Sequence, residues 1–142
     1  KYQLADLKND FDQLLGRWEI TPEMVQDDLG GGWDLLAGAL GNVGILHRAE
    51  AAEADYLLVG ELVSEELTTA DGWHWRRGVF TVSLQDRNSR RIFGTHQWFF
   101  KASSRQAEMV DIRARSKLAA VLDRELLEVL TSFGQGEEIK AN

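Results

Sequence analysis

Three segments with β-strand composition follow one another in the middle of the chain, and they constrain the fold more than any other feature. Residues 56–63 are apolar at both odd and even positions, which predicts a strand covered on both faces. Residues 75–84 alternate between apolar and polar side chains, as a half-buried strand does. Residues 92–100 are rich in aromatic side chains. We therefore expect three consecutive antiparallel strands.

Two polar segments are expected to connect these strands. Residues 64–72 are polar and acidic and contain the turn dipeptide Asp71-Gly72, so they predict a solvated hairpin loop. Residues 86–90 form a second polar segment, of the kind that closes a hairpin. Because both connections are short, strands that follow one another in the sequence are expected to lie side by side in the sheet.

A long helix is predicted after the strands. Ser103 and Gln106 have the spacing of a capping box at a helix start, and Gly134 is expected to end the helix. Such a helix is about 40 Å long, enough to cross three strands. Residues 135–142 are expected to fray. Helical spacing relates the apolar residues Ile112, Ala119, Leu122, Leu126, Val129, Leu130 and Phe133.

The first third of the chain, residues 1–46, is predicted to be mainly helical. Thr21 followed by Pro22 is typical of a helix start. The three consecutive glycines at residues 30–32 are expected to form a flexible joint before a further helical segment over residues 33–40. Apolar residues at helical spacing predict a first helix at residues 4–15. A short apolar run at residues 43–46 predicts a brief strand or an extended link.

This order of elements predicts an α+β two-layer sandwich formed by a single domain over residues 1–142. Its sheet is expected to have three to four mainly antiparallel strands, with the long C-terminal helix and the N-terminal helices beside it. Residues 1–46 form the helical part of this scheme, and residues 54–133 form the meander with the long helix.

Composition excludes several classes of function. The chain has 16 Lys and Arg against 23 Asp and Glu, a net charge of −7, which argues against binding to nucleic acid and to anionic membrane surfaces. It contains no cysteine, so a thiolate nucleophile and a thiolate metal site are both excluded. With 44% hydrophobic residues, a packed core is expected.

No motif in the sequence indicates catalysis, a cofactor or a metal. The glycines at residues 30–32 lack the spacing and the lysine of a phosphate-binding loop. The three histidines lack companion ligands at metal-site spacing, and no serine lies in a nucleophile elbow. We therefore predict a protein that is not an enzyme and assign no catalytic, cofactor-binding or metal-ligating residue.

The pentapeptide Trp-His-Trp-Arg-Arg at residues 73–77 is the least ordinary segment of the chain. Tryptophan and arginine are enriched at binding hot spots, so one interpretation is a partner-binding patch. The residues assigned to it are Trp73, Trp75, Arg76 and Arg77. In the other interpretation, one tryptophan fills the end of the core and the arginines pair with Glu65 and Glu66 across the hairpin.

Two segments carry a resemblance to bacterial envelope proteins. They are ADYLLVGEL at residues 54–62 and FTVSLQDR at residues 80–87, followed by a polar turn and an Ala/Leu-rich helix. This pattern, over residues 54–133, is similar to the LpoB and CsgG lipoproteins, to the amino-terminal domain of TolB, and to the auxiliary lipoproteins of lipid-transport ABC systems. The resemblance implies a strand and a helix before residue 54, and a function in binding.

The resemblance and the missing chemistry favour a non-enzymatic accessory or assembly domain that binds another envelope protein or forms a homo-oligomer. The resemblance also implies a location in the periplasm. In a more specific version of this expectation, a lipid attached upstream of Lys1 anchors the protein to the outer membrane. A second hypothesis is a carrier of lipid or another small ligand, with an apolar cleft lined by Trp33, Leu36 and Leu40. A third is a small hydrolase. An exposed aromatic patch near Trp73 and Trp75 would favour the binding domain over the carrier.

Overall fold

Four strands and two helices make up the part of the chain that the computed structural model describes, residues 20–42 and 56–141. The helix expected at residues 4–15 and the strand expected at residues 43–46 lie outside it. In chain order the elements are β1 (Ile20–Asp27), α2 (Gly32–Asn42), β2 (Tyr56–Thr68), β3 (His74–Asp86), β4 (Ile92–Ser104) and α3 (Ala107–Ala141).

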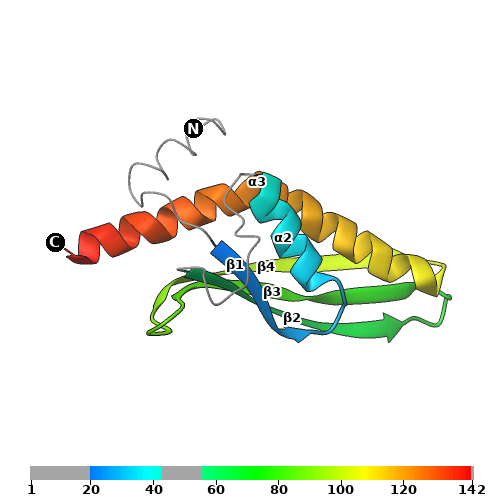
Figure 1. Cartoon of the computed structure of the whole chain (residues 1–142). Coiled ribbons are helices and arrows are strands. Elements are labelled where there is room, and N and C mark those ends of the chain that lie inside the picture. The colour runs from blue at the N-terminus through cyan, green and yellow to red at the C-terminus, as the bar shows by residue number, and fades with distance from the viewer. Residues whose placement is uncertain (1–19, 43–55, 142) are drawn as a thin grey trace.

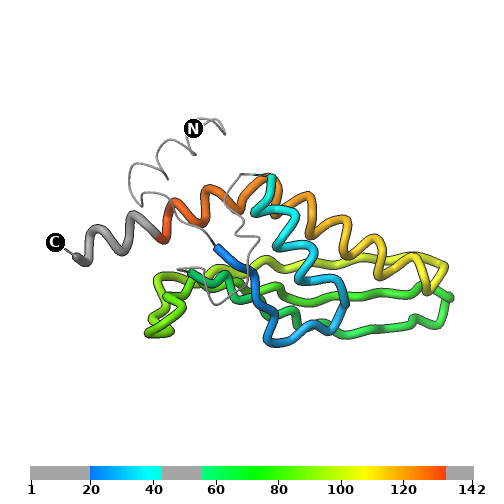
Figure 2. The backbone as a smooth tube through the Cα atoms, viewed as in Figure 1, coloured from blue at the N-terminus to red at the C-terminus, as the bar shows by residue number. Residues whose placement is uncertain are grey.

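The four strands form one sheet in the order β1-β2-β3-β4, and both helices cover the same face of it (Figure 1). The pairs β2–β3 and β3–β4 are antiparallel, which confirms the predicted meander. β1 is parallel to β2. The two hairpin turns lie at opposite ends of the sheet, and α3 runs back along its length beside α2 (Figure 2). The α+β two-layer architecture is therefore confirmed.

The hydrophobic core lies between the sheet and the two helices. Five apolar side chains at even-numbered positions in the middle of β2 and β3 face this core and have no accessible surface: Leu58, Leu62, Phe80, Val82 and Leu84. On β4, Trp98 and Phe100 are buried against α3, as the aromatic run predicted. β2 is also buried on its other face near its start, at Leu57 and Val59, which confirms the expectation for a strand that is apolar at both parities.

The predicted helix start at Thr21 and Pro22 is wrong, because both residues lie in β1. Proline is tolerated in a strand at the edge of a sheet, where its missing N–H breaks no ladder bond. The Pro22 carbonyl oxygen accepts a hydrogen bond from the indole Nε1 of Trp33, at 3.1 Å. The glycine segment is consequently a joint between a strand and a helix, whereas the sequence predicted one between two helices.

The loop predicted for residues 64–72 is shorter than expected, because β2 continues to Thr68. Its polar residues are compatible with a strand since each acidic side chain faces a basic one on β3. The two opposed pairs are Glu65–Arg77 and Glu66–Arg76. The turn at Asp71-Gly72 is confirmed, and Gly72 takes a positive φ of 86° there.

The ends of α3 also differ from the prediction. The Ser104 hydroxyl accepts a hydrogen bond from the backbone N–H of Gln106 at 3.1 Å, in the turn just before the helix begins at Ala107. The helix does not stop at Gly134 but continues to Ala141. An interior glycine costs a helix about 1 kcal/mol relative to alanine, which is too little to end one this long.

Replacing Gly31 with alanine should destabilise the protein by about 1–2 kcal/mol, because Gly31 has a φ of +76° that L-residues adopt at a cost. Gly38, in the middle of α2 with open space around its Cα, is the matched control, and Gly38→Ala should stabilise by up to about 1 kcal/mol. Urea unfolding measures both changes. A Gly31→Ala protein as stable as the wild type would contradict the expectation.

Candidate functional site

The face of the sheet opposite the helices, which we call the open face, presents an apolar row across three strands. Val63 on β2 lies opposite Val79 on β3, and Val79 lies opposite Phe99 on β4. The Phe99 side chain is 80% exposed, and Val63 is 38% exposed. A large aromatic side chain this exposed, in a contiguous apolar row, is a feature of binding surfaces.

This row forms the floor of a shallow depression of about 500 Å³ on the open face. A row of charged residues borders it on the side of the β2–β3 hairpin, where Glu65, Arg77 and Lys101 lie opposite one another. The residues that line the depression are Val63, Ser64, Glu65, Arg77, Gly78, Val79, Phe99, Phe100 and Lys101. The floor is therefore apolar and one wall is charged.

Lys101 gives this wall a positive charge that no described carboxylate neutralises. Arg77 is paired with Glu65, its Nε lying 2.6 Å from the carboxylate oxygen, and both side chains are more than half exposed. Lys101 instead stacks over the Trp75 ring, with Nζ 4.7 Å from the ring centroid. A cation held over an aromatic ring keeps its charge available to a partner.

Trp73 lies outside β3, two residues before Trp75. It precedes β3 and lies in the hairpin turn, where the Arg105 guanidinium is 5.0 Å from its ring centroid. Trp73 is therefore not part of the strand, whereas Trp75 is. Neither tryptophan is buried, so neither fills the end of the core.

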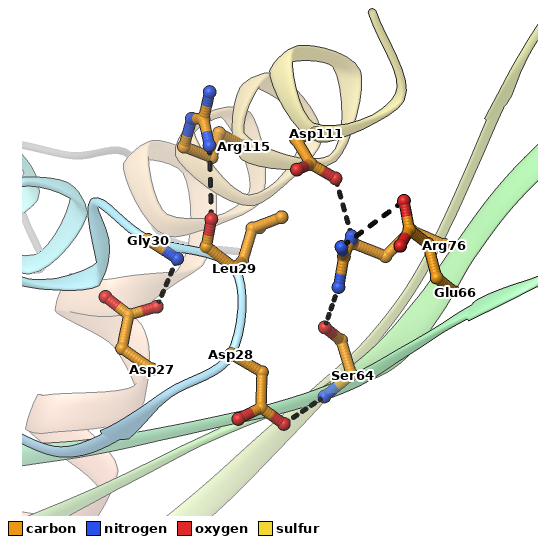
Figure 3. Close-up of polar contacts among 9 residues, drawn as sticks. All are labelled: Asp27, Asp28, Leu29, Gly30, Ser64, Glu66, Arg76, Asp111 and Arg115. Atoms are coloured by element: carbon orange, nitrogen blue, oxygen red, sulfur yellow. Dashed lines mark hydrogen bonds and ion pairs between the residues drawn. The ribbon is translucent and has the colours of Figure 1, made fainter. Parts of the chain in front are cut away.

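Because side chains alternate along a strand, Arg76 lies on the opposite side of the sheet from Arg77. Neighbours within the chain hold it in place (Figure 3). Its Nε lies 2.6 Å from Asp111 on α3, and its Nη1 donates to the Ser64 hydroxyl at 2.7 Å. Glu66 is within 3.7 Å of its Nη2. Its side chain is only 12% exposed. Arg76 thus connects the hairpin to α3 and is not accessible from the open face.

Four hydrogen bonds hold the loop between β1 and α2, and three of them are drawn in Figure 3. Asp27 accepts hydrogen bonds from the backbone N–H groups of Gly30 and Gly32, both at 2.8 Å. Asp28 accepts one from the Ser64 N–H at 3.0 Å, and Arg115 donates to the Leu29 carbonyl at 3.2 Å. The glycine-rich loop is therefore occupied by the protein's own carboxylates.

The pKa of Asp28 lies below its ordinary value, because the Ser64 N–H, then the Gln26 amide, favour the charged form. A group with a lower pKa in the folded state stabilises the protein above its unfolded pKa, and this contribution is lost as the pH falls through the folded pKa. The melting temperature should therefore fall below about pH 4. Asp28→Asn should reduce this fall, since asparagine does not titrate. Identical melting profiles of the two proteins between pH 7 and pH 2.5 would contradict the role.

The open-face site differs from the predicted patch in its central residues. Of the four predicted residues, Trp75 and Arg77 lie on β3 at the site and Trp73 lies just before β3 in the hairpin turn. Arg76 is held against Asp111 of α3. Phe99 and Lys101 were missed as site residues. The alternation of β4 could have indicated them. Phe99 and Lys101 alternate with the core residues Trp98 and Phe100, so their side chains lie on the opposite face.

The residues expected to line a ligand cleft do not form one. Leu36 and Leu40 have no accessible surface within the core, and Trp33 is half exposed on the outside of α2. In the described ranges, no three His, Asp or Glu side chains gather as metal ligands. Nor is any helix of those ranges both long and apolar enough to span a bilayer.

The fold defined by these elements is a parallel β1–α2–β2 unit followed by an antiparallel meander and a long helix on the same face. No protein-family model matches the chain, and no curated protein matches its sequence. Solved structures do share the fold. A "putative lipoprotein" from Caulobacter crescentus has a TM-score of 0.58 at 13% identity, over 94% of this chain and 99% of that chain.

Two other solved structures have the same arrangement. Protein XCC0632 from Xanthomonas campestris, of the DUF330 family, has a TM-score of 0.55 at 14% identity, over 85% of this chain and 87% of its own. The PelC dodecamer from Paraburkholderia phytofirmans has a TM-score of 0.52 at 19% identity, over 75% and 87%. At these identities the likeness establishes the fold.

Proposed function

We propose that this chain is a non-enzymatic accessory or assembly domain of the bacterial envelope, which binds another envelope protein through the open face around Phe99. The observation that carries the proposal is the 80% exposure of Phe99 at the β4 end of an apolar row. An exposed phenylalanine leaves apolar surface in contact with water, and a binding partner would bury that surface. We propose that the domain lies in the periplasm. A more specific form of this proposal is that the protein is also anchored to the outer membrane.

The fold supports this proposal in two ways. The structures with the same fold include one from Caulobacter crescentus that is described as a "putative lipoprotein". The segments at residues 54–62 and 80–87 resemble LpoB, CsgG and TolB, and β1 and α2 supply the strand and helix that this resemblance implies. Those relatives act by binding, and we assign the same kind of role here, with no catalytic residue, cofactor or metal.

The charges at the site indicate the chemistry of the partner. The chain as a whole carries a net charge of −7, yet Lys101, Arg77 and Arg105 lie at the hairpin end of the open face with Glu65 as the acidic residue among them. A matching surface has an apolar side chain for the Val63–Val79–Phe99 row and a carboxylate for Lys101. Such complementarity sets the orientation of the partner more than its affinity.

Site-specific photocrosslinking in cells that produce the full native protein tests the proposal. A photoreactive amino acid at position 99 should yield a discrete adduct with a different envelope protein. The same amino acid at position 128, an exposed site on α3 on the other side of the sheet, should not yield that adduct. With the purified partner, Lys101→Glu should weaken binding by about tenfold or more and leave the melting temperature unchanged.

Two outcomes would contradict the proposal. One is an adduct pattern that is the same at positions 99 and 128. The other is a position-99 adduct that contains only a second copy of the chain. Cell fractionation of the same samples tests the envelope location, which a cytoplasmic fraction containing all of the protein would contradict.

A further inference from the structure

The two edges of the sheet are built differently. The β1 edge carries Pro22 and Glu23 and has an irregularity between Met24 and Gln26. Proline, charge and a bulge are the devices by which sheet edges avoid pairing with other strands. The β4 edge has none of these over Thr95–Phe99, which reads Thr-His-Gln-Trp-Phe. One edge is therefore protected and the other is open to pairing.

The outward-facing backbone groups of β4 can be identified from contacts with α3. The carbonyl of Lys101 accepts a hydrogen bond from Lys117 Nζ at 2.6 Å, and the carbonyl of Ser103 accepts one from Arg113 Nη1 at 2.9 Å. These carbonyls point away from β3. Since backbone direction alternates along a strand, Thr95, Gln97 and Phe99 point outward too.

The available part of this edge has defined ends. At the C-terminal end of β4, the side chains of Arg113 and Lys117 already donate hydrogen bonds to the outward carbonyl oxygens. The irregularity in the β3–β4 register next to Ile92 ends it on the other side. Between them, no described residue bonds to the outward backbone groups of Thr95, Gln97 and Phe99. The open window is thus five residues long and centred on Gln97.

We propose that a second copy of this chain pairs with this window in antiparallel orientation, about a two-fold axis at Gln97. The window is symmetric about its central outward-facing residue, which is what pairing with itself requires. Gln97 then lies opposite Gln97 of the second copy, and Thr95 lies opposite Phe99 of the second copy. All three opposed pairs exchange both backbone hydrogen bonds.

The side chains fit this arrangement. Phe99, 80% exposed in one copy, lies beside the short Thr95 side chain of the other. No formal charge lies within the window, so no like charges oppose one another. The pairing joins the two sheets, with the helices of both copies on one face and both open faces on the other. The interface is small, so the dimer should dissociate in the micromolar range or above.

A charge-swap experiment at the axis tests the pairing. Sedimentation of the full chain should show a concentration-dependent monomer–dimer equilibrium. Gln97→Lys and Gln97→Glu each place like charges opposite one another and should weaken dimerisation by about tenfold or more. Mixing the two variants in equal amounts should restore it, because lysine then faces glutamate. Gln85→Lys, on the interior strand β3, is the control and should leave dimerisation unchanged.

Two further measurements separate this pairing from other association. Amide exchange at Thr95, Gln97 and Phe99 should slow as protein concentration rises, in the wild type and in the variant mixture. Raising the salt from about 0.05 M to 0.5 M should strengthen the dimer, because it screens the repulsion between two chains of net charge −7. Melting curves verify that each variant is folded.

Three results would overturn the proposal. They are a wild-type chain that stays monomeric up to about millimolar concentration at high salt, single variants that dimerise like the wild type, and a mixture that does not regain the dimer lost in the single variants. Phe99 takes part in both proposals, so their tests are read separately. A position-99 adduct with a second copy alone would support the pairing and contradict the proposed function. A position-99 adduct with another protein is compatible with either result here.

Discussion

Replacing Trp98 with alanine should destabilise the protein by about 3–5 kcal/mol, whereas Phe99→Ala next to it should change the stability by less than about 0.5 kcal/mol. Trp98 is 6% exposed, contacts Phe80 in the core, and donates its indole N–H to Glu125 at 3.1 Å. The alanine variant leaves a cavity under α3 and removes this hydrogen bond. Phe99 faces the open side and loses little when truncated.

Urea unfolding at low protein concentration, where self-association does not contribute, measures both changes. The comparison is well matched because the two residues are adjacent in β4 and both are aromatic. Equal losses for the two variants would show that the open face is covered by structure of its own. A small loss for Trp98→Ala would show that the helix layer does not depend on β4.

Gly78→Ala is expected to be the most damaging small substitution, with a loss of about 3 kcal/mol or more. A Cβ atom at Gly78 would overlap the backbone carbonyl oxygen of Val63 and the Cα of Ser64 at 2.8 Å. These are backbone atoms of the neighbouring strand, so relief requires β2 and β3 to separate. That separation would also pull the Ser64 hydroxyl from Arg76.

Circular dichroism melts of Gly78→Ala and Gly38→Ala measure the contrast between a crowded and an open glycine. Gly38 has nothing within 4 Å of the position that a Cβ would take. The expected results have opposite signs. A Gly78→Ala protein that melts with the wild type would mean that the β2–β3 pair relaxes without cost.

Much of the meander and of the long helix was predictable because each depends on residues close in sequence. Alternation in residues 75–84, the turn at Asp71-Gly72 and the helical spacing after Ser104 are local signals, and the structure agrees with them. β1 was not predictable in this way. Its Thr21-Pro22 pair is a good helix start by itself, and only pairing with β2 makes it a strand.

The candidate site was predictable in part, and strand parity explains the difference. Residues 75 and 77 share a face with Val79, while residue 76 shares the core face with Phe80. The predicted patch therefore included both Arg77, which lies on the open face, and Arg76, which contacts Asp111 of α3. The prominence of Phe99 depends on which face α3 covers, which is a tertiary property.

The parallel placement of β1 has a consequence for how the chain folds. β2, β3, β4 and α3 each contact an element adjacent in sequence, so they assemble by closing short loops at small entropic cost. β1 reaches β2 only after the chain has passed through α2 and residues 43–55. We therefore expect the meander and α3 to form first during folding, and β1 to pair with β2 afterwards.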